Sequence, residues 1–221
     1  MSKLLLTLAI ATSTLLFSCS PRVPAESKSP DNSETKPQLR LYGGKRTRTS
    51  MVQWYLAELN LPYEYVELDI RAGDNLKPEY LAVNPMGKLP AIADGDLKLW
   101  ESGAILLYLA WKYDPKATSP EEQAKIAQWV LFANATLGPG LFLEDRREKE
   151  MPRLLGPLDE IFQKQPFLLG EEFTSADVAV GYYLYMARLL LKLDYAPYPA
   201  VQKYLESLSS RSPFLETVGN R

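Results

Sequence analysis

The chain of 221 residues contains no histidine and a single cysteine, Cys19. Without histidine it has no imidazole general base, no Ser–His or Cys–His nucleophile pair and no histidine metal ligand. One cysteine excludes an intramolecular disulfide and a zinc knuckle. An excess of positive charge is also lacking: 25 Lys and Arg against 27 Asp and Glu give a net charge of −2, which offers no basic field for nucleic acid. Any chemistry must therefore come from hydroxyl, carboxylate, Lys, Arg and main-chain groups.

The first 37 residues have the composition of a leader and a tether. The apolar run of residues 4–17 is too short to span a bilayer as a stable helix, and a small residue precedes Cys19. The run Leu16–Cys19 resembles a bacterial lipobox, which predicts a signal peptide over residues 1–18 and a lipid on Cys19. The segment 19–37 is rich in Pro and Ser and poor in apolar residues, so a disordered tether is expected.

This leader predicts a lipoprotein that faces the periplasm and touches the membrane only through the lipid on Cys19. The alternative is a cytoplasmic chain with an unrelated N-terminal extension. The sole cysteine stands at the lipobox position, which favours export.

The remaining sequence predicts two domains. The whole chain is 46% hydrophobic and 24% charged, which is ordinary for a globular protein. Residues 38–114 alternate strand and helix patterns, whereas residues 115–221 show helical patterns only. We therefore expect an α/β domain, with both faces of its sheet covered, followed by an all-α domain.

The first domain has the order β-α-β-α-β-β-α, which is the thioredoxin-like order. Its elements are expected over residues 39–43, 49–60, 63–68, 77–83, 89–93, 97–100 and 102–113. In the second domain, helices are expected over residues 120–137, 147–163, 174–191 and 201–209. The glycines of Gly138-Pro139-Gly140 are expected to end the first of these, and Thr174 with Asp177 to form a capping box for the third.

Pro90 stands near the start of the predicted strand 89–93, within Gly87-Lys88-Leu89-Pro90. Proline cannot donate to a strand ladder, so it lies at the first residue of a strand or on an edge. A trans Leu89–Pro90 bond would simply begin the strand. A cis bond would turn the main-chain N–H and C=O of Leu89 outward, where they could pair with an extended peptide.

Glu101-Ser102 precedes an apolar helical run. Ser102 is an ordinary N-cap residue, but a helix N-terminus also presents free N–H groups and a positive dipole end that suit a carboxylate. Glu101 could accept an ammonium group. The pair would therefore fit the α-amino acid end of a small peptide.

Together, Gly87-Lys88-Leu89-Pro90 and Glu101-Ser102 resemble the glutathione S-transferase family. So does the start of the folded region, Leu41-Tyr42-Gly43-Gly44 followed by residues 52–64. The resemblance covers about residues 39–214, and the sequence looks most similar to a cyanobacterial, chi-like branch of the family. It implies a homodimer that detoxifies small apolar electrophiles by conjugating them to the glutathione thiolate, with glutathione as co-substrate and no other cofactor or metal.

The resemblance also implies how glutathione would bind. Lys88 would meet the glycine carboxylate, and Leu89, next to Pro90, would pair with the cysteinyl main chain. Glu101 and Ser102 would hold the γ-glutamyl end. Three aromatic residues of the helical domain are candidates to contact the electrophile, although aromatic residues in such helices are more often core residues: Trp129, Phe132 and Phe142.

The residue that would activate the thiol departs from the family pattern. The family usually supplies Tyr, Ser or Cys just after the first strand, but the usual serine position falls on Arg46, followed by Thr47. Arg46 could stabilise a thiolate by charge and Thr47 by a hydroxyl hydrogen bond, so both are predicted as catalytic. The alternative is that Arg46 lies on the surface and Thr47 or Thr49 merely caps the helix.

Two functions therefore compete. Members that exchange disulfides through an enzyme thiol use a cysteine in the first helix turn, and this chain has none there, so that chemistry is not expected. Conjugation is supported by the intact set at residues 88–90 and 101–102. The alternative is a non-catalytic binding or interaction module of the same fold, which the altered residue 46 favours.

Overall fold

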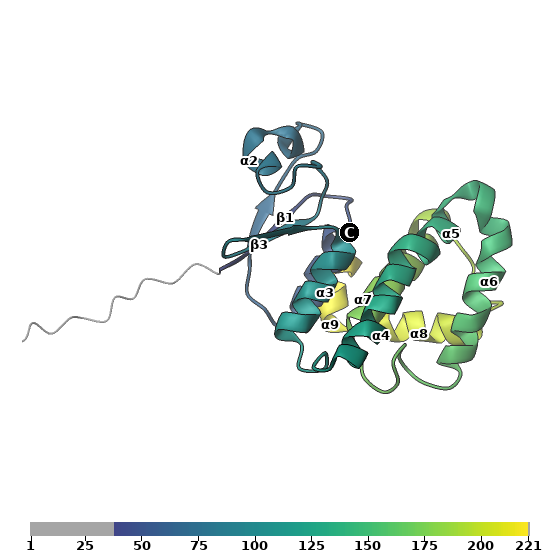
Figure 1. The fold of residues 1–221 in the computed structure, drawn as a ribbon. Helices are drawn as coiled ribbons and strands as arrows, with labels where there is room; N and C mark the ends of the chain where they lie inside the picture. Colours follow the sequence, from purple (N-terminus) through teal and green to yellow (C-terminus); the bar gives the residue numbers. More distant parts are fainter. Residues whose placement is uncertain (1–37, 221) are drawn as a thin grey trace, which may run out of the picture. The chain divides into compact units, whose positions relative to one another are not determined.

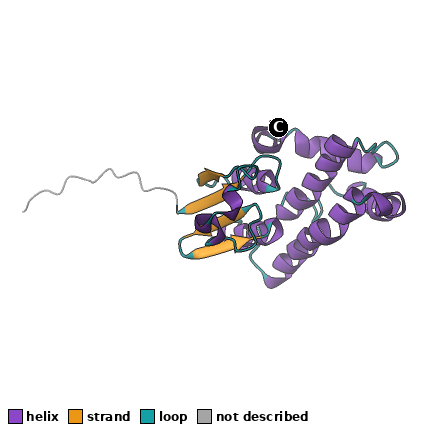
Figure 2. Ribbon diagram, turned by 90° about the horizontal axis from the view of Figure 1, so that it is seen from above, coloured by secondary structure: helices purple, strands orange, loops and turns teal. Residues whose placement is uncertain are grey.

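Four strands form one mixed sheet in the order β2–β1–β3–β4 (Figures 1 and 2). The computed structural model describes residues 38–220, so the expectations for the signal peptide, the tether and Cys19 fall outside the described residues. The strands are β1 (Leu39–Gly43), β2 (Glu64–Glu67), β3 (Ala91–Asp94) and β4 (Leu97–Trp100). β1 pairs parallel with β2 and antiparallel with β3, which pairs antiparallel with β4.

Helices connect and cover these strands in the predicted thioredoxin-like order. They are α1 (Thr49–Glu58), the short 3-10 turn η1 (Asp74–Leu76), α2 (Pro78–Leu81) and α3 (Ser102–Tyr113). The parallel pair β1–β2 needs a crossover connection, which α1 provides.

Alternation along β1 places its side chains on opposite faces of the sheet. Leu39 and Leu41 are buried in the core that contains α1 and α3. Tyr42 lies in a second, smaller cluster with Tyr80 of α2, where the two ring centroids are 5.8 Å apart. Both faces of the sheet are therefore covered, as expected from the sequence.

The rest of the chain is helical. The elements are α4 (Pro120–Phe132), η2 (Ala133–Leu137), α5 (Gly138–Phe142), α6 (Glu144–Phe162), α7 (Ser175–Leu191), α8 (Pro199–Ser209), α9 (Ser212–Phe214) and η3 (Leu215–Gly219). Figure 2 shows these helices gathered on one side of the strands. Within residues 38–220, no helix is long and apolar enough to cross a bilayer.

The two parts share one hydrophobic core around Trp54 of α1. This side chain is fully buried. Its ring lies 5.8 Å from that of Phe173 and 4.9 Å from that of Phe214, both in the helical part. Its indole N–H donates to Glu58 (2.9 Å), whose carboxylate also accepts two hydrogen bonds from Arg211, each 2.7 Å long.

The prediction that Gly138-Pro139-Gly140 ends a helix is wrong. These residues form the start of α5, and the chain leaves the helical conformation only at Leu143, where ψ is 116°. Proline is tolerated in a first helical turn. The two glycines serve close packing instead: a Cβ on Gly138 would lie 2.8 Å from Tyr183, and one on Gly140 would lie 2.5 Å from Leu154.

The next helix also differs from its prediction, because α6 begins at Glu144 rather than at residue 147. It then continues through two prolines, Pro152 and Pro157. Beyond α8, the described chain adds α9 and η3, which the sequence pattern did not reveal.

Asp177 closes the start of α7. Its buried carboxylate accepts hydrogen bonds from the main-chain N–H groups of Leu168 and Thr174, both at 2.9 Å. It also accepts from the hydroxyls of Thr174 (3.2 Å) and Tyr204 (3.0 Å). Burial outweighs these bonds and raises the pKa of Asp177 to about 6. The capping box predicted from residues 174 and 177 is therefore present, and it links three separate segments.

Candidate functional site

The segment before β3 leaves main-chain groups open. The Leu89–Pro90 peptide bond is cis. No hydrogen bond joins the main-chain N–H or C=O of Leu89 to another residue in the described part of the chain. The C=O of the preceding Lys88, by contrast, accepts from the Tyr80 hydroxyl and from the side-chain amide of Asn84 (2.7 Å). Leu89 therefore presents the open donor and acceptor that an extended peptide needs for strand addition.

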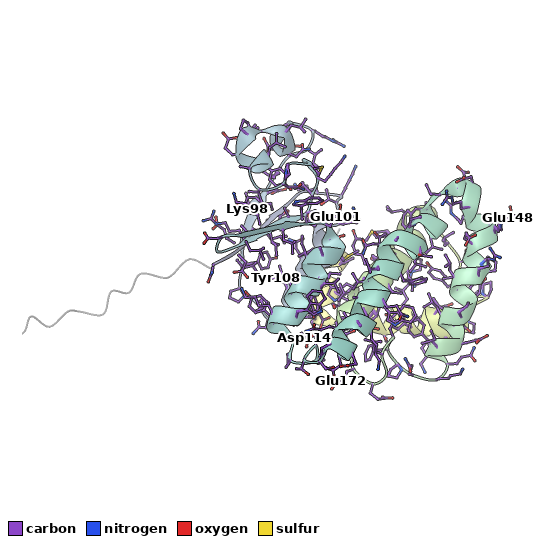
Figure 3. The ribbon with its side chains drawn as sticks, in the orientation of Figure 1. Lys98, Glu101, Tyr108, Asp114, Glu148 and Glu172 are labelled. Atoms are coloured by element: carbon purple, nitrogen blue, oxygen red, sulfur yellow. The ribbon has the colours of Figure 1, made fainter. Side chains whose placement is uncertain are left out.

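Glu101 and Ser102 mark the start of α3 (Figure 3 labels Glu101). Glu101 is exposed and has φ 72° and ψ 117°, a conformation that favours glycine. Such backbone costs on the order of 1 kcal/mol or more and is concentrated at ligand sites. Ser102 is buried at the first turn, where main-chain N–H groups lack helical partners. This end of α3 thus combines an exposed carboxylate with free N–H donors.

The loop between β1 and α1 carries Arg46, which is exposed and has φ 60°. With Lys45 it lines a cavity of about 590 Å³ at the carboxyl ends of β1 and β2. The structure therefore places Arg46 at the exposed edge of this cavity. Among residues 38–220, no group of three or more Asp, Glu, His or Cys side chains is placed to hold a metal ion.

Thr47 lies at the base of the same loop. Its hydroxyl donates to the C=O of Gly44 (2.7 Å) and lies 2.6 Å from the Thr49 hydroxyl. A Cβ on Gly44 would lie 2.7 Å from the C=O oxygen of Leu68 and 3.0 Å from a methyl group of Leu89. The loop therefore borders Leu89, and only glycine fits where they meet.

Asn134, which the sequence did not single out, joins both parts of the chain. It lies in η2, and its Oδ1 accepts from Nη1 of Arg48 (3.3 Å), the Ser102 hydroxyl (3.4 Å) and the Tyr183 hydroxyl (3.1 Å). Arg48 also donates to the Tyr183 hydroxyl (3.3 Å). No local sequence pattern could have identified this cluster, because its four residues come from four segments that are far apart in the sequence.

The three aromatic residues that were candidates for the electrophile site lie in two different parts of the helical domain. Trp129 and Phe132 form an edge-to-face pair with centroids 5.4 Å apart and line a groove of about 260 Å³ between α4 and α6. Phe142 instead packs against Tyr183, with centroids 6.3 Å apart. Of the three, Phe142 therefore lies next to the cluster around Asn134.

Comparisons with known proteins identify the family of this chain. Residues 37–111 match the family model described as "Glutathione S-transferase, N-terminal domain", and residues 142–207 match "Glutathione S-transferase, C-terminal domain". The chain is 32% identical to "Disulfide-bond oxidoreductase YfcG" of Escherichia coli strain K12, over 77% of this chain and 90% of that relative. It is also 32% identical to "Glutathione S-transferase GstB" of the same strain, over 75% and 89%.

A solved structure is similar along almost its whole length. The glutathione transferase URE2P6 of Phanerochaete chrysosporium, crystallised with oxidized glutathione, superposes with a TM-score of 0.72 at 30% identity. The match covers 83% of this chain and 96% of that one. With its thioredoxin-like domain, its helical domain and these relatives, the chain belongs to the glutathione S-transferase family.

Proposed function

We propose that this protein, as a homodimer, transfers the thiolate of bound glutathione to small apolar electrophiles. The observation that carries the proposal is the open main chain of Leu89 near the start of α3: Ala91, two residues after Leu89, pairs with Trp100, two residues before Ser102. In this arrangement the cysteinyl main chain pairs with Leu89, and the γ-glutamyl carboxylate takes the free N–H groups near Ser102. Glu101 takes the ammonium group, and the exposed Lys88 takes the glycine carboxylate. The relative solved with oxidized glutathione supports this assignment.

The chemical task is to ionise the thiol. A free thiol with a pKa near 8.5 is only about 3% thiolate at neutral pH. Lowering that pKa by about 2 makes the thiolate the major form and corresponds to about 2.7 kcal/mol of differential stabilisation. Part of the gain is lost because a less basic thiolate is a weaker nucleophile.

We assign this task first to Arg46 and Thr47, at the N-terminus of α1. Arg46 would act by charge from the edge of the cavity, and the dipole of α1 would add to it. Thr47 would act by a hydroxyl hydrogen bond. In the described structure the Thr47 hydroxyl donates its proton to the C=O of Gly44. The hydroxyl would therefore have to break this hydrogen bond in order to donate to the thiolate.

Substitution of these residues tests the assignment. Arg46→Gln and Thr47→Val are each expected to raise the pKa of the bound thiol, by about 1 and about 0.5, since each removes a group that favours the charged form. The pH dependence of kcat/KM for conjugation measures this pKa. Arg40→Gln is the control, because Arg40 pairs with Glu64 on the sheet surface (3.3 Å). An unmoved pKa in both variants would remove Arg46 and Thr47 from this role.

A second candidate is glutathione-dependent disulfide reduction, which the relative named as a disulfide-bond oxidoreductase favours. Here the glutathione thiolate would attack a disulfide sulfur directly, releasing one thiolate and leaving a mixed disulfide. A second glutathione would attack the glutathione sulfur of that mixed disulfide, releasing the other thiolate and oxidized glutathione, so no enzyme cysteine is needed. Retention on immobilised glutathione, followed by assays with an aryl halide and with hydroxyethyl disulfide, separates the candidates. Binding with no turnover of either substrate would instead indicate a non-catalytic module.

We also propose that a lipid on Cys19 anchors the protein to the membrane, facing the periplasm. The lipobox-like run Leu16–Cys19 and the Pro- and Ser-rich segment 20–37 support this proposal. In a bacterial host, the full chain is expected to incorporate radiolabelled palmitate and to fractionate with membranes, whereas Cys19→Ala does neither. An unlabelled wild type in the cytoplasmic fraction would favour the cytoplasmic alternative.

A further inference from the structure

We infer that Arg48, held in place by Asn134 and Tyr183, is a second cation that stabilises the thiolate of bound glutathione. This inference rests on the proposed function and names a residue and a mechanism within the same site. It starts from an arginine whose positive charge is not neutralised by the protein around it.

Arg48 is half-buried and lacks a carboxylate partner. Its hydrogen bonds to the described residues all come from Nη1 and go to neutral oxygens, on Asn134 and Tyr183. No ion pair joins it to an acid among residues 38–220. Arg211, by contrast, makes a two-point contact with the carboxylate of Glu58. A partly desolvated guanidinium without a counter-ion is costly, and Nε and Nη2 of Arg48 remain able to bind an anion.

The position of Arg48 adds to this positive potential. Arg48 immediately precedes α1, and Ser102 begins α3, so the shared acceptor Asn134 brings the N-terminal ends of two helices together. Each end carries a partial positive charge. Lys45 and Arg46 from the same loop add further charge, Glu101 at the start of α3 opposes it, and the hydroxyls of Tyr182 and Tyr183 approach from α7.

The helical part fixes the guanidinium in this place. The side-chain amide of Asn134 donates to the C=O of Val130 (2.9 Å), which leaves its Oδ1 to accept from Arg48. A Cβ on Gly103 would lie 3.0 Å from the Asn134 amide nitrogen, so glycine allows the close approach. The Tyr182 hydroxyl donates to the C=O of Thr47 (3.3 Å) and so holds the loop that ends at Arg48. Asn134 and Tyr183 are therefore positioning residues for Arg48.

Titration of the glutathione bound to each variant tests the inference, with the thiolate followed by its ultraviolet absorbance. Arg48→Gln is expected to raise the pKa of the bound thiol by about 1 to 2, and Arg48→Lys by less because it keeps the charge. Tyr183→Phe and Asn134→Ala should each raise the pKa of the bound thiol by about 0.5, because each removes a hydrogen bond that positions the Arg48 guanidinium. Arg188→Gln, on the exposed face of the same helix α7, is the matched control and should leave it unchanged.

These measurements separate a failure of the role inferred for Arg48 from a failure of the proposed function. An Arg48→Gln variant with an unchanged thiol pKa and a raised KM for glutathione would show that Arg48 binds a carboxylate of the tripeptide, and would overturn the inference. A wild type that forms no thiolate on addition of glutathione would remove the proposed function and this inference together. If Arg48→Gln does not fold, Tyr183→Phe and Asn134→Ala are tested in its place, and an unchanged pKa of the bound thiol in both variants would overturn the inference.

Discussion

Replacement of Asp177 by alanine is expected to lower the free energy of unfolding by about 4 kcal/mol. The carboxylate accepts four hydrogen bonds at a fully buried position, and the donors on Leu168, Thr174 and Tyr204 would lose their acceptor. Each buried donor left without a partner costs about 1–3 kcal/mol. Urea unfolding measures the loss. Asp194→Ala is the control, because that exposed carboxylate accepts only from the main chain of Ala196, and it should cost less than about 1 kcal/mol.

The same carboxyl gives stability a pH dependence. Burial raises the pKa of Asp177 to about 6, whereas an unfolded Asp titrates near 3.9. Between these values the folded protein holds a proton that the unfolded chain has lost, so the free energy of unfolding falls as pH rises. The advantage of the wild type over Asp177→Asn, which does not titrate, should therefore be larger near pH 4 than near pH 8, by up to about 3 kcal/mol. An advantage that grows toward pH 8 would contradict this assignment.

Replacement of Ser102 by alanine is expected to weaken glutathione binding by about 10- to 100-fold. A hydrogen bond to a charged partner contributes about 1.5–3 kcal/mol, and the variant removes the hydroxyl at the proposed carboxylate site. Glu101→Gln should have a similar effect, because it removes the charge that would face the ammonium group. Isothermal titration calorimetry measures both affinities, and Glu172→Gln, at an exposed position outside the proposed site, is the control.

Glu101→Gly distinguishes a ligand-binding residue from a structural one. Glycine adopts the observed φ of 72° without strain, so this variant should be more stable than the wild type by about 0.5–1 kcal/mol. It should nevertheless bind glutathione more weakly. A variant that is both less stable and unchanged in affinity would show that Glu101 serves the fold rather than the ligand.

The motifs that the sequence identified are short and local. Residues 87–90 and 101–102 each lie within a few residues of one another, and the strand and helix periods around them were sufficient to place them at the edge of a sheet and the start of a helix. The same reading failed at Gly138-Pro139-Gly140, because a local signal for termination was outweighed by packing against Tyr183 and Leu154. The spacing of glycines in the sequence does not distinguish a glycine that ends a helix from one that allows close packing.

The rest of the site depends on contacts that are remote in the sequence. Arg48 and Tyr183 are 135 residues apart, and Arg48 and Asn134 are 86 apart. The turn of π-helix that carries Asn134 has no composition signal of its own. Trp129 and Phe132 became candidates by their aromatic character alone, and only the structure shows that they line the groove between α4 and α6.

The burial of Trp54 has a consequence for how the chain matures. This indole belongs to α1, and its ring packs edge-to-face against that of Phe214, near the last described residues. During synthesis the thioredoxin-like half is complete long before Phe214 leaves the ribosome. That half therefore emerges with part of Trp54 uncovered, and this ring is fully packed only after Phe214 has been synthesised.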